Sequence, residues 1–235
     1  MVLLFIHGAG GLSEEWICQT DYFNNSVAIS LPGHYQGEPC SSIEGYVDWL
    51  RGYIRHQQYQ DVILAGHSMG GAIALLYGLR YPDHTKGLIL IGTGARLKVL
   101  PALLGQLEAM ANDQESWHRF VEDSYRLVAP QFRRVLVRLR IRGGPRVMLN
   151  DLLCCDKFDV MKDVHNIKLP TLVLCGGEDE MTPVKYTRYL AESIRGARQA
   201  IIQGASHLVF LEKAKKVNRV IEEFLKSLEE AKRTG

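Results

Sequence analysis

The segment GHSMGG at 66–71 places Ser68 just after an apolar run at 62–65 and just before a helix-like stretch. A nucleophile on a sharp strand-to-helix turn needs small residues two positions to either side, because the two backbones pass too close there for a side chain. Gly66 and Gly70 meet this requirement. Backbone N–H groups at a helix start also favour developing negative charge. The pattern predicts that Ser68 is a catalytic nucleophile; the alternative is a chance glycine-rich turn.

A second glycine-rich loop, HGAGG at 7–11, follows the first apolar run. Acyl transfer builds an oxyanion that needs two convergent donors, and backbone N–H groups suit this role because they are already fixed in place. We expect one donor from Met69 and the other from Ala9, with Gly10 as the second choice. His7 is interpreted as a structural residue of the loop. A phosphate-binding loop is the alternative, but the stretch lacks a Walker Lys-Ser/Thr pair and the spacing of a dinucleotide fingerprint.

A serine hydroxyl needs a general base, and histidine has the suitable pKa. His207 lies between the last apolar run and the final helix, so we expect it at the same carboxyl edge of a sheet as Ser68. His67 is expected to point away from Ser68. The remaining histidines lie in turns or on polar helix faces, where a solvated role is expected. They are His34, His56, His84, His118 and His165.

A carboxylate must orient this base and stabilise the imidazolium. Asp179, in GGEDEMTP at 176–183, follows an apolar run and is the expected acid. Glu178 and Glu180 are rivals, because a one-residue difference in the turn would exchange them. The other position for such an acid, after the preceding strand, is GTG at 92–94 and carries none.

These residues require a sheet whose strands end at a common edge. Short runs of continuous apolar character alternate with helix-length segments, which predicts parallel strands covered on both faces and joined by right-handed crossovers. The runs occupy residues 2–6, 27–31, 62–65, 88–91, 172–175 and 200–202. Ser41 with Glu44 forms a capping box before an amphipathic helix over 46–57.

The stretch 96–166 interrupts this alternation. It contains no strand pattern, and its length exceeds what a crossover needs. It consists of amphipathic helical pieces at 101–111, 117–128, 131–142 and 146–155. We therefore predict a core formed by 1–95 and 167–235, with a helical cap, 96–166, inserted before the strand that precedes the acid.

The motifs HGAGG, LPGH (31–34), GHSMGG, GGEDEMTP and GASH (204–207) occur in the order found in the α/β-hydrolase fold superfamily. The chain resembles its small bacterial carboxylesterase, lysophospholipase and monoacylglycerol-lipase-like serine hydrolases. This resemblance implies a mostly parallel sheet of about six strands and a Ser-Asp-His triad in that chain order. It also implies that the cap roofs the pocket.

The cap supplies the candidate wall of an acyl pocket, for which we name Leu103, Leu127 and Leu153. Arginines recur every four residues at Arg134, Arg138, Arg142 and Arg146. A solvated face is the favoured interpretation, and recognition of an anionic substrate group by one of them is the alternative.

Composition narrows the class of protein. The chain has 235 residues, and its formal net charge of +2 gives no support to nucleic-acid binding. Five cysteines without CxxC spacing argue against a disulfide framework or a zinc site. We expect a cytoplasmic monomer or homodimer with reduced thiols and no membrane span. We also expect no metal or cofactor, and a small-molecule ester as the partner.

The predicted reaction is hydrolysis of a carboxylic ester through an acyl-enzyme. The same triad could hydrolyse a carbon–carbon bond of a diketone, open an enol-lactone or perform cofactor-free perhydrolysis, because specificity depends on pocket shape. A ligand-binding protein that retains the scaffold without turnover is the remote alternative.

Overall fold

A computed structural model describes residues 1–234, and it contains one six-stranded sheet in the order β2-β1-β3-β4-β5-β6. All neighbouring strands pair in parallel. The strands are β1 (Val2–Ile6), β2 (Ser26–Ile29), β3 (Val62–His67), β4 (Thr85–Ile91), β5 (Thr171–Gly176) and β6 (Arg198–Ile202). The predicted parallel sheet of about six strands is confirmed.

Burial explains why the apolar runs predict strands so well. Every residue of β3 and β5 is buried, whereas the edge strand β6 exposes its first two residues. In the register of the sheet, Gly66 pairs with both Ile6 and Leu90, so the central strands end level with one another. The loops after β1, β3, β4 and β5 therefore open at one edge.

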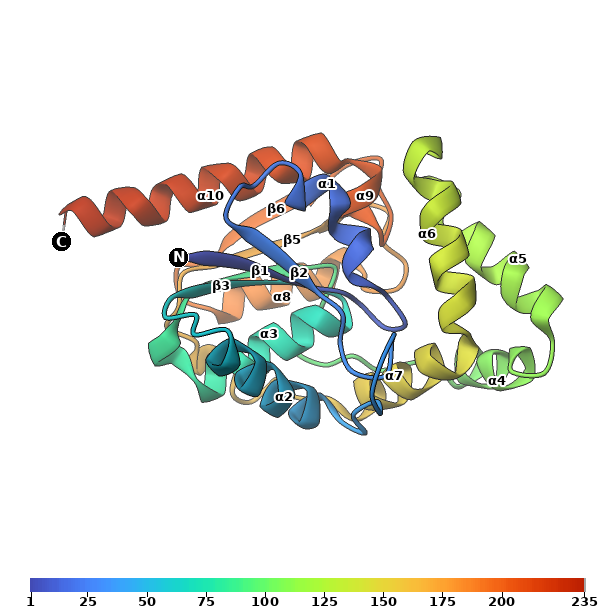
Figure 1. Cartoon of the computed structure of the whole chain (residues 1–235). Coiled ribbons are helices and arrows are strands. Elements are labelled where there is room, and N and C mark those ends of the chain that lie inside the picture. Colours follow the sequence, from blue (N-terminus) through green and yellow to red (C-terminus); the bar gives the residue numbers. More distant parts are fainter. Residues whose placement is uncertain (235) are drawn as a thin grey trace.

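Helices cover both faces of the sheet (Figure 1), with α2, α3 and α8 on one side and α1, α9 and α10 on the other. Their bounds are α1 Ile17–Thr20, α2 Ile43–His56, α3 Met69–Arg80, α8 Val184–Ser193, α9 Val209–Glu212 and α10 Ala214–Thr234. Short 3-10 helices cover Ser13–Trp16, Pro82–His84 and Val164–Asn166.

The predicted capping box at the start of α2 is wrong by one residue. The helix begins at Ile43, and the Ser42 hydroxyl, not that of Ser41, accepts a hydrogen bond of 3.1 Å from the Gly45 N–H. Glu44 is then the second helical residue, one position too early for the reciprocal bond of a capping box.

Four further helices lie between β4 and β5 and form a separate group beside the sheet (Figure 1). They are α4 Pro101–Met110, α5 Gln114–Ser124, α6 Pro130–Gly143 and α7 Pro145–Lys157. We call this group the helical insertion. Its two ends are tied together, because the Val160 N–H donates to the Ala95 carbonyl at 2.8 Å and Arg96 pairs with Asp159 in an antiparallel bridge.

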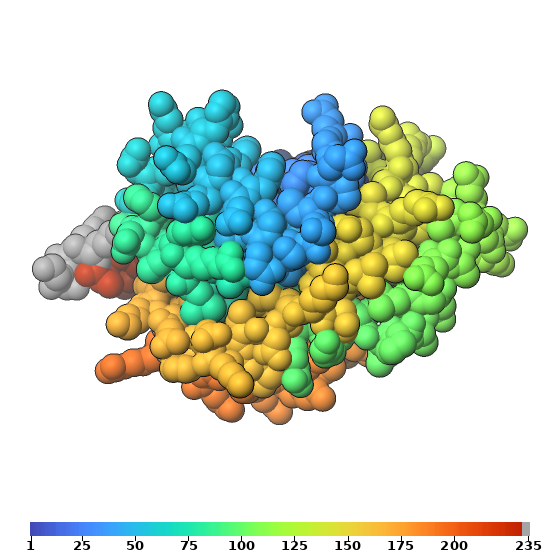
Figure 2. Space-filling model, turned by 90° about the horizontal axis from the view of Figure 1, so that it is seen from below, coloured from blue at the N-terminus to red at the C-terminus, as the bar shows by residue number. Residues whose placement is uncertain are grey.

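The helical insertion also contacts the loop that precedes α2. In the space-filling view (Figure 2), α7 adjoins this loop. Two side chains of α7, Asn150 and Cys154, donate to the Cys40 carbonyl oxygen. The division of the chain into core and cap units stays a prediction.

Candidate active site

Ser68 occupies a strained turn between β3 and α3. Its φ of +52° lies in the left-handed region, and its backbone N–H donates to the Ile91 carbonyl oxygen at 2.9 Å. A Cβ at Gly66 would lie 2.1 Å from the Gly70 carbonyl oxygen, and one at Gly70 would lie 2.2 Å from that of Ile6. Glycine is therefore required at both positions for Ser68 to stand at the start of the helix.

His207 and Asp179 form a hydrogen-bonded pair. The His207 Nδ1 lies 3.0 Å from Oδ1 and 2.9 Å from Oδ2 of the buried Asp179 carboxylate. Thr182 also donates to this carboxylate, from its backbone N–H and from its hydroxyl, each at 2.8 Å. With Nδ1 turned to the carboxylate, the imidazole presents Nε2 as a base.

The charge of Asp179 is stabilised where it stands. Burial raises the pKa of this carboxyl, but the hydrogen bond and charge of His207 and the bonds from Thr182 lower it by more, so its pKa lies below the ordinary 3.8. The rivals Glu178 and Glu180 are exposed, and neither bonds to His207 within residues 1–234.

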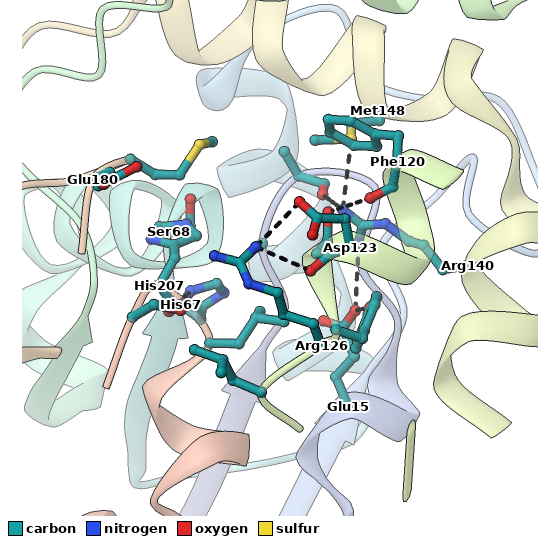
Figure 3. Close-up of a pocket in the computed structure, with 18 of the residues that line it drawn as sticks. Glu15, His67, Ser68, Phe120, Asp123, Arg126, Arg140, Met148, Glu180 and His207 are labelled. Atoms are coloured by element: carbon teal, nitrogen blue, oxygen red, sulfur yellow. Dashed lines mark hydrogen bonds and ion pairs between the residues drawn. The ribbon is translucent and has the colours of Figure 1, made fainter. Parts of the chain in front are cut away.

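Ser68 and His207 line the same cavity, of about 350 Å³. Figure 3 shows the two residues side by side with His67 at one end of this cavity. In the part of the chain that the structure describes, the Ser68 hydroxyl makes no hydrogen bond. His67 is buried and contacts the backbone instead, with its Nε2 donating to the His207 carbonyl oxygen at 2.9 Å.

The two alternative oxyanion donors of the glycine-rich loop, Ala9 and Gly10, differ in whether their N–H groups are free. Among residues 1–234, the N–H groups of Ala9 and Met69 have no hydrogen-bond partner, and Ala9 lines the cavity. The prediction for Gly10 is wrong, because its N–H donates at 2.7 Å to the buried carboxylate of Asp151. His7 is buried, and its Nε2 accepts from the Leu31 N–H at 3.0 Å, which holds the loop against the segment that follows β2.

The three leucines named for an acyl wall differ in their position relative to the cavity. Leu103 and Leu127 line the cavity of about 350 Å³. Leu153 is 41% exposed, and it lines neither this cavity nor the smaller one described below. Its place on α7 is taken by Met148 and Leu152. One residue along a helix turns the side chain by about 100°, which is enough to move it from wall to surface.

A second cavity of about 240 Å³ shares five lining residues with the first, Ser68, Leu103, Leu152, Glu180 and Met181. Its other lining residues are mainly apolar, and include Leu97, Val99, Leu100, Pro183 and Tyr186. The two cavities therefore meet at the serine.

The arginines at 134, 138, 142 and 146 are all exposed and line neither cavity, and α6 ends at Gly143 before the last of them. The arginines that line the larger cavity are Arg126 and Arg140, and neither belongs to this set of four.

The expectation that His34 is solvated is wrong. It is buried, and its Nε2 bonds to Asp151 at 2.8 Å. Sequence reasoning also missed Asp151, Glu15 and Arg140. A signal for Asp151 existed, because it lies three residues after Met148 and four before Cys155, on the buried stripe of α7.

Within residues 1–234, no three His, Cys, Asp or Glu side chains are grouped to hold a metal ion. The helices of that range include none long and apolar enough to cross a membrane. The five cysteines are free thiols.

The chain belongs to the alpha/beta hydrolase family, whose sequence profile matches residues 3–220. It is 25% identical to the monoacylglycerol lipase abhd6-A of Xenopus laevis over 97% of this chain and 76% of that protein. It is 26% identical to a pimeloyl-[acyl-carrier protein] methyl ester esterase of Neisseria meningitidis over 86% and 83%.

Solved structures agree with this assignment. A thermophilic esterase superposes with a TM-score of 0.81 at 30% identity, covering 96% of this chain and 90% of its own. The enol-lactonase of Burkholderia xenovorans LB400 has the same fold, with a TM-score of 0.83 at 21% identity over 95% and 90%. Hydrolysis is the class of reaction that this family membership supports.

Proposed function

We propose that the protein hydrolyses carboxylic esters, with Ser68 as nucleophile, His207 as general base and Asp179 as the residue that orients the histidine. The observation that carries this proposal is the pairing of His207 Nδ1 with both oxygens of Asp179 in the cavity that also contains Ser68. Among residues 1–234 the Ser68 hydroxyl has no competing hydrogen-bond partner, so it is free to donate to Nε2 of His207, which lines the same cavity.

In the first step the Ser68 Oγ attacks the ester carbonyl carbon, and its proton passes to His207 Nε2. The oxygen of the tetrahedral intermediate accepts from the N–H groups of Ala9 and Met69. The intermediate collapses to an acyl-enzyme, and the leaving alcohol takes the proton from the imidazolium. In the second step His207 takes a proton from water as the water oxygen attacks the acyl carbon. The acyl–serine bond then breaks, Ser68 Oγ takes the proton from the imidazolium, and the carboxylic acid leaves.

The two cavities favour short to medium acyl chains. Their apolar walls are closed by the helical insertion, through Leu103 on α4 and Leu152 on α7. We propose that residues 96–166 form the cap of the active site. The esterase and lipase names among the relatives support the same class of substrate.

Burst kinetics test the proposal. With p-nitrophenyl esters, we expect a burst of one p-nitrophenolate per enzyme when deacylation is slow, followed by steady turnover. Ser68→Ala and His207→Gln should lose both phases. A panel that adds an enol-lactone and a diketone decides between reactions of the same triad. Turnover of the diketone alone, with no ester hydrolysis, would contradict the proposal.

A further inference from the structure

One peptide group of the glycine-rich loop is held at both of its polar atoms by the helical insertion. In the peptide that joins Ala9 to Gly10, the carbonyl oxygen of Ala9 accepts from Arg140 Nη2 at 2.7 Å. The N–H of the same peptide donates to Asp151 Oδ2 at 2.7 Å. Arg140 comes from α6 and Asp151 from α7, so two different helices fix one peptide plane.

Arg140 is itself held by contacts to the second nitrogen of its guanidinium. Arg140 Nη1 lies 3.4 Å from Oε1 of Glu15, whose side chain is buried, and the Tyr125 hydroxyl donates to the same oxygen. Figure 3 shows Arg140 reaching into the cavity between Glu15 and Met148. The Glu15 carboxylate balances the charge of the Arg140 guanidinium, and the Ala9 carbonyl oxygen occupies one of its nitrogens. This guanidinium is therefore suited to holding the loop rather than to binding a substrate anion.

The aspartate is fixed equally well. Asp151 is fully buried, and besides the Gly10 N–H it accepts from His34 Nε2 at 2.8 Å and from the Tyr46 hydroxyl at 2.7 Å. Burial raises the pKa of Asp151, but these bonds and the charge of His34 lower it by more, so the carboxylate is charged at neutral pH. A charged acceptor with three donors in a buried site is a rigid anchor.

The loop needs such anchors. Three of the residues at 8–11 are glycines, and Gly10 has a φ of +59°, so the local sequence permits many conformations and selects none. An oxyanion donor is effective only if its N–H is already aimed at the place where charge develops. The Ala9 N–H belongs to the peptide directly before the clamped one.

We propose that Arg140 and Asp151 are positioning residues that complete the oxyanion hole by clamping the Ala9–Gly10 peptide. The helical insertion is then a structural part of the catalytic machinery as well as a cover over the substrate. This inference rests on the proposed esterase function.

The test compares variants of the full chain by kcat per active site, KM and inhibition by a trifluoromethyl ketone, whose adduct with serine mimics the oxyanion. Sites are counted by exhaustive fluorophosphonate labelling. Arg140→Met and Asp151→Asn should lower kcat about 10- to 100-fold and raise the inhibition constant by a similar factor, with KM within about threefold of wild type. Arg140→Lys should recover part of the loss.

Arg138→Met is the matched control, since Arg138 lies on the same helix but is exposed; it should behave as wild type. A purely structural role would lower the melting temperature and leave kcat per labelled site unchanged, and that result in both clamp variants overturns the proposal. If both clamp variants fail to fold, Tyr125→Phe provides the test, because it loosens only the Glu15–Arg140 contact. A lower kcat at constant KM in this variant supports the clamp. An unchanged kcat contradicts it.

Failure of the clamp and failure of the esterase proposal are distinguishable. If the wild type shows no Ser68-dependent hydrolysis, the esterase proposal fails first. If the wild type is active and Ser68→Ala is not, while both clamp variants retain the wild-type kcat and inhibition constant, only the clamp is wrong.

Discussion

Gly92 lies directly against the carboxylate of Asp179: a Cβ built on this glycine would lie 3.2 Å from Oδ2. It would also lie 3.5 Å from His207 Nδ1, and the φ of Gly92 is +51°. The absence of a side chain at Gly92, after β4, therefore leaves room for the carboxylate of Asp179, which lies in the loop after β5.

Gly92→Ala is expected to impair both stability and catalysis. The left-handed backbone costs an alanine about 1–2 kcal/mol, and the methyl group crowds the histidine–aspartate pair. We expect a lower melting temperature and a kcat reduced at least several-fold, measured by thermal unfolding and ester hydrolysis. Gly105→Ala is the control, because among residues 1–234 no atom outside its own helical backbone and chain neighbours lies within 4 Å of its built Cβ. Wild-type kcat in Gly92→Ala would show that the pair tolerates the methyl group.

Asp179→Asn separates the three acidic candidates of the loop after β5. An amide cannot stabilise the imidazolium and favours the wrong tautomer, so kcat should fall roughly 10³–10⁴-fold. Glu178→Gln and Glu180→Gln should each change kcat by less than about threefold, since both side chains are exposed. A larger loss in either glutamate variant than in Asp179→Asn would move the acid to that residue.

Buried neutral histidines make stability depend on pH. Burial, with a smaller effect from the charge of His34, lowers the pKa of His7 from 6.5 to about 3. Burial, followed by the charge of His207, holds the pKa of His67 well below 6.5. Below pH 6.5 the unfolded chain binds protons that the folded chain does not, so acidification favours unfolding.

Each group should remove about 1.4 kcal/mol per pH unit below pH 6.5. We expect the melting temperature to fall between pH 6.5 and 5, by roughly 2–4 °C for every kcal/mol. His67→Gln, which keeps a donor for the His207 carbonyl, should reduce this slope, and His165→Gln on the surface should not. A melting temperature that stays level or rises on acidification would contradict this account.

Leu103 lines both cavities, and a bulkier residue there should shorten the preferred acyl chain. Leu103→Trp is expected to lower kcat/KM for octanoate esters at least tenfold more than for acetate esters. Leu153→Trp, at an exposed position, should leave this ratio unchanged. Equal effects of Leu103→Trp on both chain lengths would place the acyl group elsewhere.

The sequence was informative wherever a local requirement admits few residues. Gly66 and Gly70 predict the turn at Ser68, because backbone contacts of 2.1 and 2.2 Å to a built Cβ leave no other choice. The continuous apolar runs predict the buried strands, since only strands covered on both faces need them. Chain order after each strand then places Asp179 and His207 at one edge.

The site residues that the sequence did not predict depend on contacts between segments far apart in the chain. Nothing near Gly10 or His34 in the sequence shows that Asp151 bonds to both, over more than a hundred residues. The error at Leu153 has another cause: its neighbour Leu152 is equally apolar, and only the rotation of α7 against the core decides which one faces the cavity.

The most direct test of the central claim is peptide mapping by mass spectrometry after treatment with a fluorophosphonate. Ser68 attack on the phosphorus should expel fluoride and leave one phosphonyl group per chain, on the peptide that contains Ser68. Ser68→Ala should take up none, and His207→Gln should react far more slowly. Stoichiometric labelling at any other residue, or of Ser68→Ala at the wild-type rate, would contradict the account.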